Sequence, residues 1–444
     1  MQSIRYTLWG WLALLSLLWV AVNGGVFRSG TFWALRDFLI QYSGFMAIGC
    51  MSLAMMLSLR PRWPERRLGG LDKMYRLHKW LGIGVLLLAS THWLWKEAPK
   101  WVVRAELLAR PQKGPRTPPG DPLEAVFRSL RGTAEGLGEW TFYGVVLLLL
   151  VALLPIVPYR RFRQVHRLMP VAYLVLVFHA VVLFDFADWT TPPGLVLAVL
   201  LAGGSYAALA SLSGRVGRGR RTAGTIVGLR RFPGIRSLET VVELAPGWPG
   251  HRPGQFAFVT ADPKEGAHPY TIASAWSASA PRIAFVTKAL GDYTAGLADR
   301  LRLGQPVEVE GPYGCFTFDD ERPRQIWIGG GIGITPFLAR MKQLSHRPDG
   351  KRVDLFHCTH EVDEEALRRL FEDAKAADVR LHLVVHGRHG RLTGDRIREE
   401  VPDWRDASIW FCGPSAMGKA FEADFAAEGL AVGTRFHQEL FRMR

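Results

Sequence analysis

The chain has 444 residues, of which 48% are hydrophobic, and a formal net charge of +15. This length predicts two or three domains, and a positive charge can indicate a nucleic-acid-binding protein; here, however, much of the charge flanks long apolar runs, so we expect no nucleic-acid partner. The cysteines at 50, 315, 358 and 412 show no C-x-x-C spacing, which excludes the usual cysteine-ligated iron–sulfur and zinc sites.

Long apolar runs dominate the first half of the chain, and each is near the length that a bilayer requires. They lie at about residues 6–26, 35–59, 74–95, 140–158, 166–184 and 193–212. The first follows Arg5 and exceeds a typical signal-peptide core, so we interpret it as a retained anchor. The sequence therefore predicts a multi-pass protein of the cell membrane with six spans in the lipid bilayer.

Basic residues set the predicted topology. They cluster at 60–73, 160–167 and 215–221, and the positive-inside rule makes these segments and both termini cytoplasmic. The segment 96–139 is then external although it contains basic residues, because long loops translocate with less regard to charge. Its middle, 110–122, is rich in Pro and Gly and is typical of irregular chain.

Two of the predicted spans carry a histidine near each end. His78 and His92 are 14 residues apart, which on a straight helix separates them by about 40° in azimuth and roughly 21 Å along the axis. His166 and His179 repeat the plan with a separation of 13. Parallel helices would pair His78 with His166 near the inner leaflet and His92 with His179 near the outer one. Each pair suits a flat macrocycle such as haem, which two imidazoles can ligate.

A single histidine in a span is more often a polar ring bonded to a neighbouring helix. Two pairs of nearly equal spacing favour metal ligation instead. One difficulty is that 13 residues place His166 and His179 about 140° apart on a straight helix; Pro170 is the residue that could bend or unwind it. Gly82 and Ala89 lie near the histidine face and would leave room for a macrocycle.

After Gly214 the pattern changes to short β-rich runs separated by Gly and Pro, which is typical of an antiparallel barrel. The runs are Thr225–Leu229, Ser237–Leu244, Gln255–Thr260, Tyr270–Ala273, Arg282–Thr287 and Val307–Glu310. From Arg324 onward strands alternate with helices, which predicts a parallel βαβ sheet. We therefore expect a helical membrane domain at 1–214, an antiparallel β-barrel domain at 215–320 and an α/β Rossmann-like domain at 321–444.

A glycine-rich turn follows the first strand of the α/β segment. The strand runs into Gly329, Gly330, Gly331 and Gly333, and Thr335-Pro336 then opens a helix. Glycines allow a close backbone approach, and a helix N-terminus offers free N–H groups to a pyrophosphate. Proline suits the first turn because its missing donor is not needed there. The turn is weak evidence alone, but its position after a barrel strengthens the prediction of a nucleotide site.

These features together resemble a known family. The histidine pairs are followed by His268-Pro269-Tyr270-Thr271, Gly291-Asp292-Tyr293-Thr294, the glycine-rich turn and Cys412-Gly413-Pro414. In this order the motifs resemble the NADPH oxidase and ferric reductase family of transmembrane flavocytochromes, and the resemblance covers nearly the whole chain. It implies FAD, two haem b groups and NADPH or NADH as cofactors.

The resemblance also implies roles for the flavin-side residues. His268, Pro269, Tyr270 and Thr271 would form the strand against the flavin ring, with Thr271 near its reactive edge. The alternative is that this strand simply completes a barrel. Lys288 stands where the family often has Arg, which keeps the charge but loses bidentate geometry. With the helix start at Gly291, Asp292 and Thr294 it would hold the FAD pyrophosphate.

On the nicotinamide side, Cys412 would lie beside the nicotinamide, next to Gly413 and Pro414, although a core cysteine is an equal interpretation. Phe441 would cover the flavin and be displaced by nicotinamide, or it could be a packing anchor. His360 stands where the family tends to have Arg, and Arg388 and Arg391 lie in the loop after the next strand. Arginine near this position favours NADPH over NADH.

The expected function is electron transfer from nicotinamide through flavin and the two histidine pairs to an external acceptor. O₂ giving superoxide is the first choice and a ferric chelate the second. A third possibility is a periplasmic acceptor protein. A different class is a transporter whose soluble half senses nucleotide, but carriers usually place acids within their spans, whereas Asp37, Asp185 and Asp188 lie at span ends.

Overall fold

A computed structural model describes residues 2–28, 30–109, 118–154, 156–157 and 159–439. They form two compact units. The helical unit contains the residues up to Pro64 together with Lys73–Val216, and the sheet unit contains Glu65–Asp72 together with the described residues from Gly217 onward. The short segment Glu65–Asp72 thus clusters with the second half of the chain, although the sequence places it between two predicted spans.

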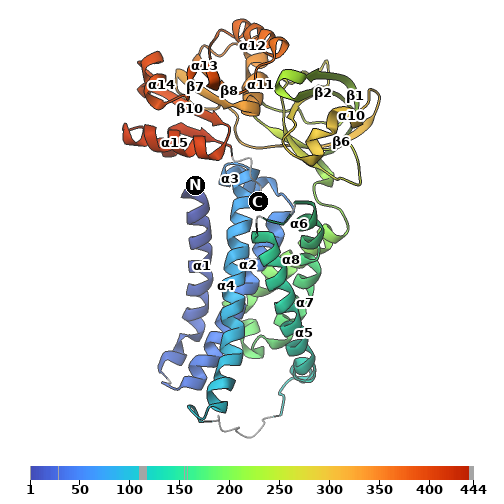
Figure 1. Ribbon diagram of the computed structural model, residues 1–444. Coiled ribbons are helices and arrows are strands. Elements are labelled where there is room, and N and C mark those ends of the chain that lie inside the picture. Colours follow the sequence, from blue (N-terminus) through green and yellow to red (C-terminus); the bar gives the residue numbers. More distant parts are fainter. Residues whose placement is uncertain (1, 29, 110–117, 155, 158, 440–444) are drawn as a thin grey trace. The chain divides into compact units, whose positions relative to one another are not determined.

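The helical unit is built from the long helices drawn in blue to green in Figure 1. Its α-helices, with the short α3 that leads into the sheet unit's segment, are α1 (Gln2–Asn23), α2 (Phe32–Ser58), α3 (Arg62–Leu68), α4 (Leu71–Arg104), α5 (Pro122–Leu153), α6 (Tyr159–His166), α7 (Met169–Leu183) and α8 (Pro192–Leu212). Polar side chains start some of them: Thr31 Oγ1 accepts from Ala34 N–H at α2, and Asp121 accepts from Leu123 N–H at α5.

Within the described residues, five helical segments are long and apolar enough to cross a membrane, namely Ser3–Arg28, Phe32–Ser58, Pro122–Leu153, Arg161–Leu183 and Pro192–Leu212. The remaining predicted span, 74–95, lies in α4, which is 34 residues long. Its histidines, lysines and tryptophans keep its hydropathy lower, so six spans stay a prediction at this helix. Helix α5 begins 18 residues before the predicted span at 140, so part of the segment 96–139 is helical; positions 110–117 lie outside the described residues.

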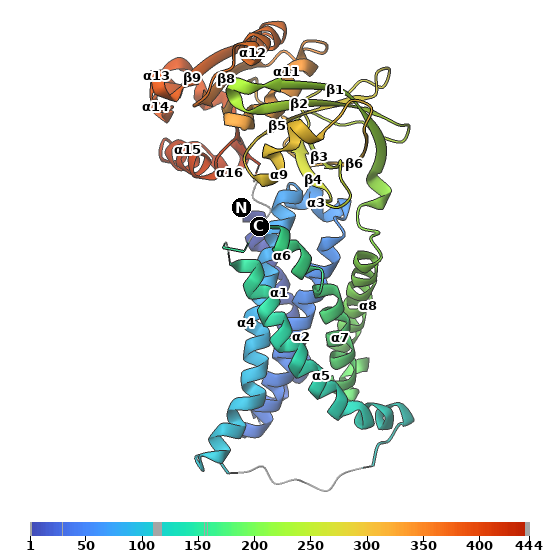
Figure 2. The same ribbon diagram turned by 45° about the vertical axis from the view of Figure 1, so that its right-hand side comes forward.

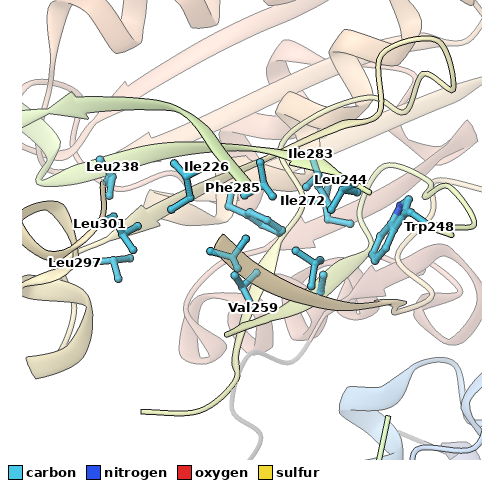
Figure 3. Close-up of a cluster of buried hydrophobic side chains, with 14 residues drawn as sticks. Ile226, Leu238, Leu244, Trp248, Val259, Ile272, Ile283, Phe285, Leu297 and Leu301 are labelled. Atoms are coloured by element: carbon cyan, nitrogen blue, oxygen red, sulfur yellow. The ribbon is translucent and has the colours of Figure 1, made fainter. Parts of the chain in front are cut away.

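The first sheet of the sheet unit is six-stranded and antiparallel (Figure 2). Its strands are β1 (Arg221–Phe232), β2 (Ser237–Leu244), β3 (Phe256–Thr260), β4 (His268–Thr271), β5 (Arg282–Lys288) and β6 (Pro306–Tyr313), in the order β4-β3-β6-β1-β2-β5. A bridge between Ile272 and Phe285 joins its two edges. Alternate side chains, among them Ile226, Val259 and Phe285, point into one interior (Figure 3). The six strands match the predicted runs with shifted ends.

The second sheet is parallel, in the order β11-β10-β7-β8-β9. Its strands are β7 (Arg324–Gly330), β8 (Arg352–Thr359), β9 (Val379–Val385), β10 (Ala407–Cys412) and β11 (Phe436–Gln438). The main helices between them are α11 (Thr335–Leu344), α12 (Glu364–Ala376), α14 (Gly394–Glu400) and α15 (Ser415–Ala427). Trp327 packs into one core cluster while Ile326 and Ile328 pack into another. Burial on both faces explains the continuous apolar strands. The sequence analysis missed only the three-residue β11.

Candidate functional site

The four membrane histidines come together in two pairs. The ring centroids of His78 and His166 are 6.1 Å apart, and those of His92 and His179 are 6.3 Å apart. An ion bound between two imidazole nitrogens at about 2 Å each would hold the ring centroids roughly 6 to 6.5 Å apart. The structure therefore spaces each pair for one shared metal ion. No group of three or more metal-ligand side chains occurs among the described residues, so these sites offer two protein ligands each.

Hydrogen bonds to backbone carbonyls orient three of the rings. Nδ1–H of His78 donates to Ala54 O, that of His92 to Ile40 O and that of His179 to Ala134 O, each at 2.9 Å. Since a carbonyl only accepts, these bonds fix the proton on Nδ1 and leave the Nε2 lone pair free for a metal. Among the described residues, Nδ1 of His166 has no such acceptor. This donor set fits axial ligation of haem, in which each ring binds through one nitrogen.

A break between two helices lies in the 13-residue stretch that separates His166 from His179. α6 ends at His166, and α7 begins at Met169 with Pro170 in its first turn. Proline is tolerated at this position because it has no N–H to leave unpaired. The predicted span 166–184 is therefore interrupted next to Pro170, the residue that the sequence indicated for a bend or an unwound turn, and the break allows His166 and His179 to face the other pair members despite their separation.

Glycines provide the space for the outer histidine pair, His92 and His179. A Cβ added to Gly138 on α5 would overlap the ring of His179, and one added to Gly44 on α2 would lie 3.1 Å from Cε1 of His92. By contrast, a Cβ on Gly82 would meet Leu149 at 3.7 Å. Sequence reasoning chose Gly82 because it shares a helix with the histidines and missed Gly138, because nothing in the sequence says that α5 packs on α7.

On the flavin side, β4 and the 291–294 turn meet through stacked rings. The ring centroids of His268 and Tyr293 are 3.9 Å apart, and the angle between the two ring planes is 7°. On Tyr293, Cζ of Arg300 lies 4.8 Å from the ring centroid. The hydroxyl of Tyr270 is buried and has no partner among the described residues, and burial raises its pKa. A buried hydroxyl without a partner is costly, so this wall suits a polar ligand group. Tyr293 was not singled out by sequence reasoning.

The turn at Gly291 is ordered by hydrogen bonds between its own residues. Thr294 Oγ1 accepts from the N–H groups of Leu290 and Gly291, at 3.0 and 3.1 Å. Lys288, which ends β5, forms a 2.7 Å ion pair with Glu361. The side chain of Asp292 lies outside the described residues. Lys288 therefore lies three residues before Gly291 in the sequence. Its ammonium group is already paired with Glu361.

The glycines of the predicted nucleotide-binding turn have different structural roles. A Cβ on Gly333 would overlap the carbonyl of Cys412, and one on Gly330 would lie 2.8 Å from Pro414, so these two glycines let the turn pack on the end of β10. Gly331 has φ of +58° and nothing within 4 Å of its added Cβ. This glycine, with the uncapped start of α11 at Thr335 and Pro336, is the part open to a ligand.

The C-terminal motif packs against the same turn. Cys412 is 0% exposed and belongs to a core cluster with Trp327 and Phe337, and burial raises the pKa of its thiol. A Cβ on Gly413 would lie 3.1 Å from the backbone of Gly330. Gly329, the last but one residue of β7, pairs with Cys412 in the sheet register. Phe441 lies outside the described residues, so its predicted place over the flavin stays a prediction.

Basic side chains surround the end of the second parallel strand. The rings of His360 and His386 lie 4.7 Å apart, and both residues are exposed, as are Arg388 and Arg391. The nearby acid Glu361 is shared between Lys288 at 2.7 Å and Arg236 at 2.8 Å. These cations hold the pKa of the Glu361 carboxyl below its usual value. An acid that is already paired twice is a poor acceptor for a ribose hydroxyl.

A cavity of about 250 Å³ opens beside these residues. Its lining includes Lys288, Glu239, Gly331, His357 and Glu361. It is smaller than typical pockets for whole ligands, so it would accommodate only part of a dinucleotide. The cavity is bordered by both the predicted glycine-rich turn, through Gly331, and Lys288, although these two residues are 43 positions apart in the sequence.

Two buried histidines of the sheet unit predict a loss of stability in acid. His251 donates through Nε2–H to Ser274 O and accepts from Trp248 Nε1–H, and His357 bonds Gly329 O through Nδ1. Burial lowers the pKa of each ring to about 4. Below pH 6.5 the unfolded chain binds protons that the folded unit excludes, so stability falls as pH drops toward 4. We expect a loss of about 2 kcal/mol for each ring at pH 5 relative to pH 7.

Thermal unfolding of the sheet unit, followed by tryptophan fluorescence at pH 7 and pH 5, measures this effect. In His251→Gln and His357→Gln the difference between the two pH values should shrink, because one titrating ring is gone. An undiminished difference in both variants would show that other groups cause the acid sensitivity.

The comparisons with known proteins match the two halves separately. The family model described as ferric reductase like transmembrane component matches residues 43–177, and the oxidoreductase NAD-binding domain matches residues 327–423. The first match contains His78, His92 and His166, and His179 lies two residues beyond its end. The second contains the glycine-rich turn and the Cys412-Gly413-Pro414 motif.

Curated relatives resemble part of the chain. It is 29% identical over 237 residues to an NADPH oxidoreductase of Mycobacterium tuberculosis, covering 50% of this chain and 60% of the relative. It is 29% identical over 167 residues to a flavohemoprotein of Bordetella pertussis, covering 34% and 41%. The chain thus spans less than two thirds of the length of either relative.

Solved structures align at low TM-scores. A cytochrome P450 reductase from Amycolatopsis shares 24% identity at a TM-score of 0.44, covering 50% of this chain and 70% of that one. A flavohemoglobin from Malassezia yamatoensis shares 17% identity at 0.46, covering 91% and 98%. The family models bear out the resemblance drawn from the motifs: the chain joins a ferric-reductase-like transmembrane component to an oxidoreductase NAD-binding domain, which matches the architecture of the NADPH oxidase and ferric reductase type.

Proposed function

We propose that the protein transfers electrons across the cell membrane from cytoplasmic NAD(P)H to an external acceptor. The observation that carries this proposal is the spacing of the two histidine pairs, 6.1 and 6.3 Å, in a chain that also has an NAD-binding domain. When bound, FAD would accept a hydride from the nicotinamide and two haem b groups would carry its electrons singly, so that one NADPH reduces two O₂ to two superoxide ions and releases one proton.

The histidine pairs would hold the two haem groups. The inner pair, His78 and His166, and the outer pair, His92 and His179, would each hold one iron from both sides. Two protein ligands leave no open position on the iron. The outer pair would hold a group that supplies electrons without binding the acceptor to its metal, which suits O₂ and bulky ferric chelates alike. The match to a ferric reductase like component favours a ferric chelate as the second candidate.

The flavin would lie against β4, with Tyr270 facing its ring and Thr271 near its reactive edge. The helix start at Gly291, Asp292 and Thr294 would bind its pyrophosphate, with Thr294 Oγ1 holding the turn through the N–H of Gly291. Lys288 would add charge, and it would have to share its contact with Glu361 to do so. On the other sheet, Gly331 and the start of α11 would bind the pyrophosphate of the nicotinamide nucleotide, and Cys412 with the Gly413-Pro414 turn would border its nicotinamide end.

NADPH is the proposed donor. An NAD site needs a carboxylate free to bind the ribose hydroxyls, but Glu361 is held by Lys288 and Arg236. His360 and Arg391 offer cationic or hydrogen-bonding groups on the exposed surface nearby, where a 2′-phosphate would lie. By the positive-inside rule, the basic segments that flank the spans would be cytoplasmic together with both termini, on the side where NADPH is available.

Anaerobic addition of nucleotide to the purified, cofactor-loaded protein tests the proposal. We expect NADPH to bleach the flavin absorption and then produce the sharp bands of reduced low-spin haem, with a haem content of two per chain. NADH should act only at higher concentration. Readmitting air or adding a ferric chelate then ranks the acceptors by the rate of reoxidation.

A protein without haem would overturn the proposal and favour a nucleotide-sensing transporter. Slow reoxidation by both air and ferric chelate would instead favour an acceptor protein outside the membrane.

A further inference from the structure

Two cations of the antiparallel sheet and one carboxylate of the parallel sheet meet near the end of β8. Glu361 accepts from Arg236 Nη2 at 2.8 Å through one oxygen and from Lys288 Nζ at 2.7 Å through the other. Arg236 lies in the connection between β1 and β2, Lys288 ends β5, and Glu361 is two residues beyond β8. These three residues, which we call the charge cluster, carry one more positive charge than negative.

The antiparallel sheet itself brings the two cations together. Ser237 pairs with Lys288 in the register of β2 and β5, and Arg236 is the residue before Ser237. The carbonyl of Arg236 also accepts from the N–H of Ala289 at 3.0 Å. Like charges on neighbouring strands repel one another, so the two cations need an anion between them. Glu361 supplies that anion in the structure.

The contact made by the Glu361 carboxylate is of a kind that another anion can replace. The backbone of Glu361 is held, because its carbonyl accepts from Thr359 Oγ1 at 2.7 Å. By contrast, 31% of its side chain and 62% of the Arg236 side chain are exposed. Exposed ion pairs contribute little stability, because water and salt screen the charges. A phosphate offers more oxygens than a carboxylate to the same Arg and Lys donors, so it can displace Glu361.

The charge cluster borders the surfaces that are proposed to bind nucleotides. The cavity of about 250 Å³ is lined by Lys288, by Glu361 and by the residues before and after Arg236. Gly331, the open glycine of the nucleotide-binding turn, lines the same cavity. Lys288 also lies three residues before Gly291, where the proposed flavin-binding turn begins. The two cations are therefore next to both regions in which a nucleotide phosphate is expected.

We propose that Arg236 and Lys288 form a binding site for a nucleotide phosphate, and that the carboxylate of Glu361 competes for this site from within the chain. The inference rests on the proposed function, to which it adds Arg236 as a ligand and Glu361 as a competitor. The phosphate belongs to the pyrophosphate of FAD or to the 2′-phosphate of NADPH, two sources of the same chemistry. Because the site must first release its internal anion, its apparent affinity for phosphate is reduced. Removing the charge of Glu361 should therefore strengthen binding, although it breaks two ion pairs.

Equilibrium binding to the full chain, purified free of FAD, tests the proposal. The probes are FAD, followed by the quenching of its fluorescence, and 2′-phospho-AMP, compared by titration calorimetry with AMP, which lacks the 2′-phosphate. In Glu361→Gln the Kd of the probe that uses the site should fall about threefold, whereas Arg236→Gln should raise the same Kd about threefold. Glu365→Gln is the matched control, since it removes the same charge from α12 and breaks an ion pair with Arg230 of the antiparallel sheet. It should leave every Kd unchanged.

The two sources of phosphate give different results. Tighter binding of FAD by Glu361→Gln, with no change for 2′-phospho-AMP, assigns the site to the flavin pyrophosphate. Tighter binding of 2′-phospho-AMP, with AMP unchanged, assigns it to the 2′-phosphate of NADPH. Unchanged or weaker binding of both probes would overturn the phosphate site and leave the proposed function intact. An unaltered protein that binds neither FAD nor NADPH would instead overturn the proposed function itself.

Discussion

Replacing His92 with alanine is expected to remove one haem per chain and to abolish reduction of external acceptors, while NADPH still bleaches the flavin at the normal rate. His92 supplies one side of the outer pair, and its Nδ1–H bond to Ile40 O holds the ring in place. Without the imidazole of His92, the outer site would have one ligand, His179, with no ring on the opposite side. Haem per chain from the pyridine haemochrome assay, together with the rate of ferric chelate reduction, measures the effect.

The control for this variant is Thr91→Ala. Thr91 is the preceding residue of α4, is exposed, and bonds only Leu87 O within its own helix. It should retain both haems and full external activity. If His92→Ala still reduced external acceptors at the normal rate, electrons would leave the protein by a path that does not involve the outer pair.

The strands and the chemistry-bearing residues were predictable for local reasons. Short β-rich runs bounded by Gly and Pro located β1 to β6, and the change to alternating strands and helices located β7 to β10. The histidine pairs could be found because their spacing is encoded within single spans. Gly331 could be found because a strand, a glycine run and Thr335-Pro336 follow one another directly.

What the sequence could not supply depends on contacts between distant segments. The carbonyls that orient the histidines belong to Ala54, Ile40 and Ala134, and a backbone oxygen has no signature in the sequence. The pairing of Lys288 with Glu361 joins residues 73 positions apart. The break after His166 was foreseeable only as an effect of Pro170, since the direction of the rings depends on where α6 ends.

The same reasoning leads to a prediction for Gly138, whose role is visible only in the packing of α5 against His179. Alanine at this position would overlap the imidazole ring and disturb its bond to Ala134 O. On helix propensity alone, Gly→Ala should stabilise α5 by about 1 kcal/mol. We nevertheless expect Gly138→Ala to lose most of the outer haem, so the packing effect has the opposite sign to the propensity effect.

A series of three glycines makes the test quantitative. Gly136→Ala is the matched control on the same helix, because its added Cβ meets nothing within 4 Å and both haems should remain. Gly44→Ala should be intermediate, since its Cβ lies 3.1 Å from the ring of His92 and a shift of a few tenths of an ångström would relieve the contact. Haem per chain should therefore fall in the order Gly136, Gly44, Gly138. Equal haem content in all three variants would mean that the position of His179 does not determine haem binding, and the ligand assignment of the outer pair would have to be abandoned.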